Sequence, residues 1–297
     1  MEKGKASSTA GDAAGARALH TLFESPVVFD DPYALGFASP NYQKMANNRL
    51  LRFFVTTFVL NKIRPVAGQV LARARYAEDL LLEAIAQGMR QYVIIGAGYD
   101  SFALRNPQLD GELKIYEIDH PDTQASKREK LAELNLQPPS MVEYVPVDFE
   151  HETVADGLAR SSFQPHAAGF FSWLGTVPYL TRSATENTLR ALAQHSAPGS
   201  QIVFDYMLPE HLVPASEMRT TRALKKFTEY RGEPLIGEID PAELAALLDN
   251  LGWQLLEDLE FDEQARRYFG NRSDGLRPWA ASSFAHALVR PPQEGDD

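Results

Sequence analysis

An apolar run that stops at a Gly-x-Gly turn constrains this sequence more than any other feature. The run covers residues 91–95, and the turn that follows is Gly96-Ala97-Gly98. A short apolar run bounded by glycine is typical of a buried strand in a parallel sheet, and glycine permits both a tight turn and the close approach of a ligand. The segment therefore predicts a nucleotide-type binding loop at the end of a strand.

A second predicted strand supports this interpretation. It covers residues 114–119 and ends in two acids, Glu117 and Asp119, which lie 21 and 23 residues after Gly96. In a parallel sheet the two carboxylates share one face at the carboxyl end of the strand, where an acid at this spacing holds a ribose. The two strands together predict a cofactor that contains a nucleoside.

The residues after the turn bear on which cofactor this is. The dinucleotide fingerprint has a third glycine where this chain has Ser101, and Asn106-Pro107 shortens the helix that follows. These departures weaken the expectation of a nicotinamide cofactor. A loop whose free amides face a carboxylate, beside an acid that holds a ribose, suits S-adenosylmethionine equally well.

The order of the predicted elements gives the fold class. Strand-like segments alternate with helical ones, and this alternation predicts a doubly wound α/β domain. The predicted strands cover residues 91–95, 114–119, 142–148, 169–174, 201–207, 253–259 and 282–289.

The rest of the chain is divided around this sheet. Residues 1–16 are rich in Ala, Gly and Ser, so we expect a disordered tail and not a secretory signal. A single domain is predicted over residues 17–297, beginning with a helical region over 17–88. A cofactor-binding core over 89–207 follows, and residues 240–297 complete the sheet. Residues 208–239 are too long for a crossover and carry a helical patch, which predicts a lid.

One arginine on a predicted helix lacks a local partner. The helix covers residues 69–87, and Arg75 has Glu78 and Asp79 within one turn, whereas Arg73 has no acid at those positions. An arginine of this kind either reaches a ligand carboxylate near the Gly-x-Gly turn or extends to solvent, and the helix alone favours solvent.

The end of the third predicted strand offers a further candidate. Asp148 followed by Phe149 at a strand tip can accept from an adenine amino group and pack against its ring. A helix cap followed by a core phenylalanine explains the same pair equally well.

Composition excludes several functions. The net charge of −11 comes from 29 basic and 40 acidic residues with no basic cluster, so we expect neither nucleic-acid nor membrane binding. The absence of cysteine rules out disulfides, thiolate metal sites and a cysteine nucleophile, and we predict no metal site. We expect a cytoplasmic protein, with which a chain without cysteine is compatible. The sequence predicts no oligomeric state.

With these segments placed, the chain resembles the leucine carboxyl methyltransferase family, including its bacterial branch of S-adenosylmethionine-dependent enzymes and polyketide carboxyl methyltransferases. The resemblance runs from about residue 16 to residue 289. The motifs that carry it are Asp30-Asp31-Pro32-Tyr33-Ala34, Ala72-Arg73-Ala74-Arg75, Gly96-Ala97-Gly98-Tyr99-Asp100-Ser101, Glu117-Ile118-Asp119-His120-Pro121 with Lys127, and Val147-Asp148-Phe149.

The resemblance implies S-adenosylmethionine as the cofactor and a role for the main motifs. Arg73 would pair with the cofactor carboxylate and Gly96 would lie against the methionyl part. Asp119 would hold the ribose, and Asp148 with Phe149 would hold the adenine. A Rossmann-like class I methyltransferase fold is also implied, with seven strands of which the last is antiparallel.

Other residues of the same motifs complete the predicted site. We expect Ala97, Gly98, Asp100 and Glu117 to line the cofactor. Many family members carry a Glu after the fourth strand, and this chain has none there. Trp173 and Tyr179 lie near that position and are substrate-side candidates, with core packing as an equal alternative.

The chemistry of methyl transfer bears on the acceptor. A carboxylate, with a pKa of about 4, is ionised at neutral pH and needs no general base, whereas a phenol with a pKa of about 10 usually does. No histidine stands in a clear catalytic setting, which favours O-methylation of a carboxylate on a small molecule or peptide. The alternatives are a phenol or alcohol of a secondary metabolite, a cofactor-binding scaffold without turnover, and an NAD-dependent oxidoreductase.

Overall fold

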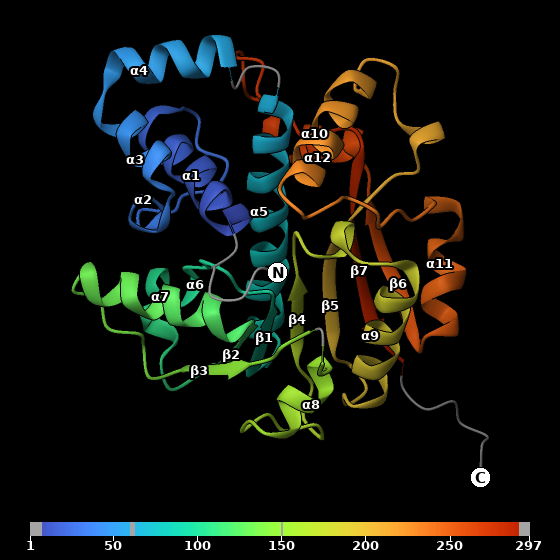
Figure 1. Ribbon diagram of the computed structural model, residues 1–297. Helices are drawn as coiled ribbons and strands as arrows, with labels where there is room; N and C mark the ends of the chain where they lie inside the picture. The colour runs from blue at the N-terminus through green and yellow to red at the C-terminus, as the bar shows by residue number, and fades with distance from the viewer. Residues whose placement is uncertain (1–7, 60–62, 150, 291–297) are drawn as a thin grey trace.

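The computed structural model describes residues 8–59, 63–149 and 151–290. Its centre is a seven-stranded sheet with helices packed on both faces (Figure 1). The strands lie in the order β3-β2-β1-β4-β5-β7-β6. Their bounds are β1 (Gln91–Ile95), β2 (Lys114–Asp119), β3 (Val142–Pro146), β4 (Phe170–Trp173), β5 (Gln201–Met207), β6 (Trp253–Leu259) and β7 (Ser282–Val289).

The direction of the strands matches the predicted class. Strands β1 to β5 pair in parallel, whereas β7 is antiparallel to both β5 and β6. The predicted α/β fold with an antiparallel last strand is confirmed. Since β1 lies between β2 and β4, the strand order reverses at β1, and ligands of open α/β sheets bind at such a point.

The other regular elements are helices and short helical turns, among them a π-helical turn (Val55–Val59) after α4. They are α1 (Ser8–Phe23), α2 (Ala34–Phe37), α3 (Pro40–Asn47), α4 (Arg49–Phe54), α5 (Arg64–Ala86), α6 (Phe102–Arg105), α7 (Pro121–Glu133), α8 (Val154–Ala159), α9 (Arg182–Gln194), α10 (Met218–Tyr230), α11 (Pro241–Asn250) and α12 (Phe261–Phe269).

Two apolar cores lie on the two faces of the sheet. Helices α5, α6 and α12 cover one face, where Tyr92 and Phe284 belong to the core. Helices α8, α9 and α11 cover the other face, where Phe204 and Trp253 belong to the core. Strands buried on both sides are expected to be apolar throughout, which is why the apolar runs of the sequence located them.

The N-terminal region differs from the prediction. The expected disordered tail over residues 1–16 is wrong for residues 8–16, because α1 begins at Ser8 and Ala14 is fully buried. Ala14 packs against Phe37 and Tyr99. Residues 1–7 lie outside the described residues. Small residues here allow close packing, since a Cβ at Gly15 would lie 2.2 Å from the ring of Tyr42.

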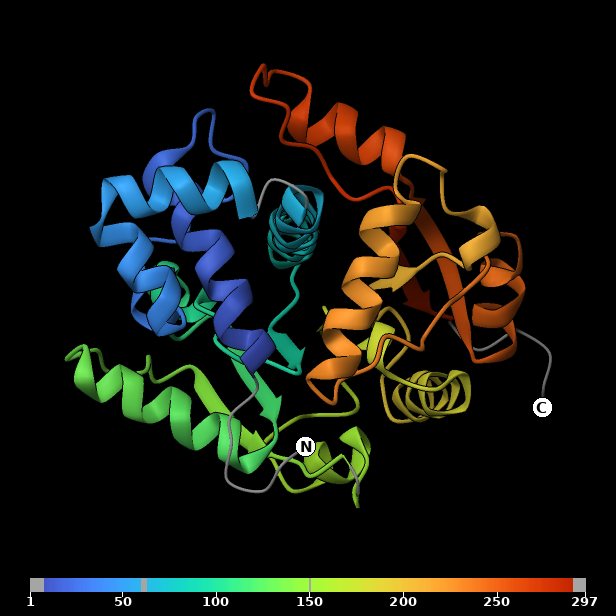
Figure 2. The same ribbon diagram turned by 45° about the horizontal axis from the view of Figure 1, so that its top comes forward.

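Other boundaries move by a few residues. The helix predicted over residues 69–87 is α5, which begins five residues earlier at Arg64, and β3 ends at Pro146 instead of continuing to Asp148. The predicted lid segment contains α10 and lies across α5 from the N-terminal helices (Figure 2). Within the described ranges, no helix is long and apolar enough to cross a membrane.

Candidate cofactor and acceptor site

The loop after β1 is held by the end of β2. Gly96 N and Ala97 N donate to Ile118 O at 2.8 and 3.1 Å, and Gly98 N donates to Asp119 Oδ2 at 2.5 Å. The prediction that free amides of this loop face a ligand carboxylate is therefore wrong, because each of these N–H groups already has a partner. The φ angles of +70° at Gly96 and +51° at Gly98 are values that L side chains rarely adopt.

Asp119 connects this loop to the helix that follows β2. Its Oδ2 accepts from Gly98 N, and its Oδ1 accepts from His120 N at 2.7 Å. Burial raises the pKa of the Asp119 carboxyl. Each carboxylate oxygen can accept two hydrogen bonds, so the half-buried side chain keeps acceptor capacity for the hydroxyls of a ribose.

Glu117 has a different environment from Asp119. It is 3% exposed, and its Oε2 lies 2.6 Å from Nζ of Lys127, which is equally buried. Desolvation raises the pKa of the Glu117 carboxyl, and the ammonium of Lys127 opposes this shift. The carboxylate of Glu117 forms a buried ion pair beneath the end of β2. We therefore assign Glu117 a supporting role instead of the predicted contact with the cofactor.

The turn after β3 lies beside Asp119. Val147 N donates to Asp119 O at 3.0 Å, which brings Asp148 to the same edge of the sheet. Phe149 is 43% exposed and therefore available to a planar group. Contact of this pair with an adenine stays a prediction.

Asp100 caps a helix. Its Oδ1 accepts from Phe102 N at 2.8 Å, at the start of α6. The side chain therefore fixes the end of the glycine loop, and its predicted contact with the cofactor stays a prediction.

Arg73 is held by a carboxylate distant in sequence. Its Nη1 lies 3.0 Å from Oδ2 of Asp205, a 2% exposed residue of β5. The other carboxylate oxygen of Asp205 accepts from Gly175 N, just after β4. The prediction that Arg73 has no partner on its own helix is confirmed. Asp205 instead holds the guanidinium at the carboxyl ends of β4 and β5, one strand away from the glycine loop.

The first helix covers the glycine loop. A Cβ at Gly98 would lie 3.2 Å from Cβ of Ala10. Arg17 fastens α1 in this position, because its Nη2 donates to Tyr99 O and its Nε to Asp31 Oδ2, both at 2.8 Å. The segment predicted as a tail is therefore one wall of the site.

A cavity of about 1020 Å³ lies beside Arg73 and is also lined by Gly175 and Asp205 at the carboxyl ends of β4 and β5. It lies between α1, α3, α4, the first turns of α5, and α10. Two contacts join α1 to the far wall: Asp12 Oδ2 lies 2.7 Å from Nη1 of Arg231, and Thr9 Oγ1 donates to Glu233 Oε2. The view in Figure 2 shows the N-terminal helices and α10 on either side of α5.

The two substrate-side candidates have different positions. Trp173 is 1% exposed and packs against Phe204, with the ring centroids 6.5 Å apart. Its predicted substrate-side role is wrong, because a strand buried on both faces places the indole in the core. Tyr179 lines the cavity together with Arg73 and Gly175, so its substrate-side role stays a prediction.

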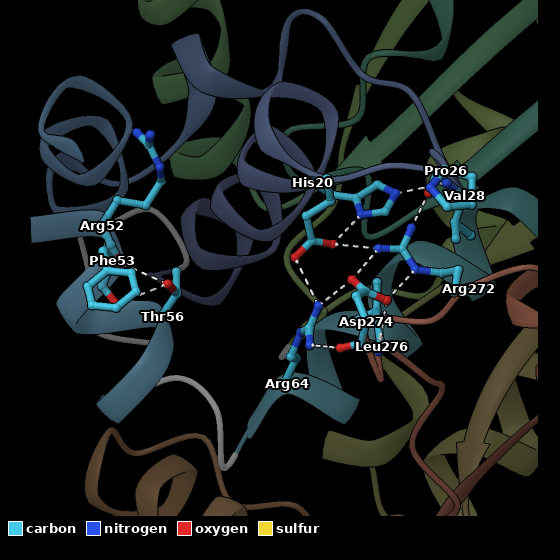
Figure 3. A network of polar contacts seen from close by, with 11 residues as sticks. His20, Pro26, Val28, Arg52, Phe53, Thr56, Arg64, Arg272, Asp274 and Leu276 are labelled. Carbon is cyan, nitrogen blue, oxygen red and sulfur yellow. Dashed lines mark hydrogen bonds and ion pairs between the residues drawn. The ribbon is translucent and has the colours of Figure 1, made fainter. Parts of the chain in front are cut away.

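A polar network closes the end of the cavity near the start of α5 (Figure 3). His20 Nε2 accepts from Val28 N at 2.8 Å, and its Nδ1 lies 2.7 Å from Glu24 Oε2. Glu24 is also within 3.6 Å of Arg64 and 3.4 Å of Arg272. The network ties α1 to α5 and to the connection before β7, which fixes this wall of the cavity.

Sequence reasoning missed Asp205 and the first residues of α1. A carboxylate inside the otherwise apolar run 202–207 was an available signal, because such a residue is almost never fully buried unless it is paired. The small residues at the start of α1 gave no apolar periodicity that could have revealed this part of the helix.

Comparisons with known proteins identify the family. The model of the family described as leucine carboxyl methyltransferase matches residues 10–193. A Bacillus subtilis protein named "Putative S-adenosyl-L-methionine-dependent methyltransferase YktD" is 32% identical over 305 residues, covering 98% of this chain and all of that protein.

Two solved structures share the fold. A duf574 family protein from Streptomyces avermitilis has a TM-score of 0.62 at 11% identity, covering 94% of this chain and 97% of its own. A protein from Thermobifida fusca, titled a putative methyltransferase, has a TM-score of 0.58 at 11% identity, covering 98% and 97%.

The residues at the sheet edge fit S-adenosylmethionine. Asp119 has acceptor capacity for a ribose, Arg73 offers a guanidinium for a carboxylate, and Phe149 presents an exposed ring. Gly96 leaves no side chain between the loop and a bound molecule. The chain therefore belongs to the leucine carboxyl methyltransferase family and is a methyltransferase that uses S-adenosylmethionine.

Proposed function

We propose that the protein methylates a carboxylate of a small, largely apolar molecule. The cofactor supplies an electrophilic methyl group: a carboxylate oxygen of the acceptor bonds to the methyl carbon as the carbon–sulfur bond breaks, giving a methyl ester and S-adenosylhomocysteine. The protein positions the two reactants and excludes water. A carboxylate is already ionised at neutral pH, so no group of the protein has to remove a proton.

The proposal rests on one observation, which concerns the side chains in the cavity that could act as a general base. Among the described residues that line it, His20 is the only histidine, and both of its ring nitrogens face partners in the network of Figure 3. Burial raises the pKa of the Tyr179 phenol, and it raises that of Tyr42 to about 12. Both phenols therefore stay protonated at neutral pH and are poor bases.

The acids of the cavity are engaged with cations. Asp205 pairs with Arg73, and Asp12 pairs with Arg231. Glu24 belongs to the arginine network at the start of α5. Each of the three carboxylates is thus held by a cation instead of being free to take a proton, which disfavours an acceptor that must lose one.

The walls indicate an apolar acceptor. Leu19, Phe23, Met45 and Val66 line the cavity, and Phe53 of α4 lies at its opening with 65% exposure. Exposed apolar side chains at the rim of a pocket often mark a binding surface. A volume of about 1020 Å³ lies at the upper end of the range for small-molecule sites, about 300 to 1,000 Å³.

The test uses methyl-labelled S-adenosylmethionine and a panel of apolar carboxylic acids. We expect a labelled product that mild alkali releases, formed at a rate that changes little between about pH 6 and 9. An alkali-stable product, with a rate that rises about tenfold per pH unit, would assign the acceptor to the phenols or alcohols instead.

A pair of arginine variants links this activity to the described site. Arg73→Lys should weaken binding of S-adenosylhomocysteine, because an ammonium cannot reproduce a bidentate guanidinium contact. Arg75→Lys is the control, since Arg75 lies two residues away and pairs with Asp79 on the surface. Equal effects of the two substitutions would remove Arg73 from the cofactor site.

A further inference from the structure

Two buried polar atoms in the wall of the cavity have no hydrogen-bond partner. Among the described residues six buried side-chain atoms are unpartnered, and only two belong to residues that line the cavity: Oε1 of Gln69 and Nε1 of Trp279. The residues are 3% and 4% exposed, so both atoms are shielded from bulk solvent. A buried polar group without a partner destabilises a folded protein, so each such atom calls for an explanation.

The orientation of the Gln69 amide is fixed by its neighbour. Its Nε2 donates to Ser282 Oγ at 2.8 Å, and Ser282 Oγ donates its single proton to Tyr206 O at 2.8 Å. Exchanging the amide nitrogen and oxygen would place two acceptors against each other. The unpartnered acceptor is therefore forced by the surrounding hydrogen bonds.

Gln69 and Trp279 lie on touching segments. A Cβ at Gly68 would lie 2.0 Å from Arg277 O, so the backbone before Trp279 runs directly against α5. Trp279 belongs to an apolar cluster against which Val66 of α5 and Leu224 of α10 pack. The orphan acceptor and the orphan donor therefore belong to the same wall, where α5, α10 and the connection before β7 meet.

This wall adjoins Arg73, the residue that we expect to bind the cofactor carboxylate. Gln69 precedes Arg73 by four residues on α5, which places it about 6 Å along the axis on the same face. Every α5 residue that lines the cavity lies between Arg64 and Arg73. Arg73 is therefore the boundary between the cofactor and the acceptor, and Gln69 lies on the acceptor side.

We propose that Gln69 and Trp279 form a polar subsite that selects an acceptor carrying a hydroxyl group. The Trp279 N–H donates to the hydroxyl oxygen, and Gln69 Oε1 accepts the hydroxyl proton, so that one group satisfies both atoms. The preferred substrate class is thus a hydroxylated apolar carboxylic acid. Both atoms are covered in this structure, and Leu224 packs against the cluster that contains Trp279. The proposed subsite therefore opens when the segment over 208–239 moves. The inference rests on the proposed function, because the bound molecule is the methyl acceptor.

The test compares matched acids with and without a hydroxyl. Calorimetry with the S-adenosylhomocysteine complex would measure the binding of medium-chain fatty acids of one length, unsubstituted or hydroxylated at successive carbons. For at least one hydroxylated position we expect binding about tenfold tighter than for the plain acid. Trp279→Phe and Gln69→Leu should each abolish this preference, so that the variant binds the hydroxylated and the plain acid equally.

A second tryptophan provides the matched control. Trp253 Nε1 donates to Leu189 O at 2.9 Å, so Trp253→Phe breaks an existing hydrogen bond, whereas Trp279→Phe removes an N–H that has none. The ligand-free melting temperature should therefore fall further for Trp253→Phe. An equal or larger loss for Trp279→Phe would show that its N–H is satisfied in solution, which overturns the inference.

The outcomes separate this inference from the proposed function. If no hydroxylated acid binds better than its plain counterpart, or if the variants weaken both acids equally, the subsite is excluded even where esters form. If the preference and its loss are observed but no alkali-labile ester forms, the subsite stands and carboxyl methylation fails.

Discussion

Gly175→Ala should separate cofactor binding from folding. Gly175 has a φ of +70°, and a Cβ there would lie 2.4 Å from Nη2 of Arg73. The guanidinium is the flexible end of its side chain, so the methyl group would displace Arg73 instead of moving the strands. Displacement would also break the contact with Asp205, which Arg73 reaches at 3.0 Å.

Two magnitudes follow from this geometry. A non-glycine residue in the left-handed region costs about 1 to 2 kcal/mol of stability. The loss of a guanidinium contact with the cofactor carboxylate removes about 1.5 to 3 kcal/mol, which is a dissociation constant raised about 10- to 150-fold. Asp205 would lose its cation as well, and an unpaired buried carboxylate lowers stability further.

The assay is calorimetry with S-adenosylhomocysteine and with methylthioadenosine, which lacks the amino-acid part. Gly175→Ala should weaken the binding of S-adenosylhomocysteine and leave the affinity for methylthioadenosine unchanged. The control is Gly199→Ala, because Gly199 has a φ of +86° with no atom near its Cβ position. The Gly199→Ala variant should be less stable than the unchanged protein but should bind S-adenosylhomocysteine with the same affinity. Full affinity of Gly175→Ala for S-adenosylhomocysteine, or equal weakening of both ligands, would refute the placement of Arg73 at the cofactor carboxylate.

Three further substitutions test other parts of the molecule. Asp119→Ala should weaken S-adenosylhomocysteine binding by about 1 to 3 kcal/mol in calorimetry, and an unchanged dissociation constant would remove it from the site. Burial raises the pKa of Asp258 to about 6, above its unfolded value, so its ionisation lowers stability as pH rises from about 4 to 6. Asp258→Asn should therefore raise the free energy of unfolding by about 1 kcal/mol at pH 8 but not at pH 4, a modest effect because the side chain is partly exposed. Thermal unfolding at the two pH values measures this, and an equal change at both would contradict it. Arg17→Ala should release α1 from Asp31 and Tyr99 and increase proteolysis before residue 23, unless these contacts are dispensable.

The sheet was predictable because each of its strands corresponds to a local pattern in the sequence. Each is an apolar or alternating run that ends near a glycine, proline or acid, and β2, β5, β6 and β7 have the predicted bounds. β3 ends two residues early, because its last bond to β2, from Val147 N, goes to O of Asp119, the residue at which β2 ends. A sequence pattern reports periodicity, and the last residues of a strand depend on such single contacts.

The site was predictable only in part. Asp119 and Arg73 were identified from spacing, from missing partners and from the family resemblance, but their partners were not. The prediction that the loop amides are free was wrong, because these N–H groups donate to Ile118 O and to the Asp119 carboxylate. Such contacts between neighbouring strands cannot be read from the spacing of residues in the sequence. Asp205, the partner of Arg73, is 132 residues away in sequence.

The same distinction explains why the acceptor is harder to infer than the cofactor. The glycine loop and Asp119 lie within two consecutive strands, so a short motif specifies them. The cavity instead depends on contacts between Thr9 and Glu233, 224 residues apart, and between Gln69 and Ser282, 213 residues apart. Substitutions in α1, α10 or the connection before β7 change the cavity wall without touching the loop between β1 and β2. The acceptor can therefore vary within the family while the cofactor site stays the same, and Gln69 and Trp279 are the residues at which this chain's own choice should be sought.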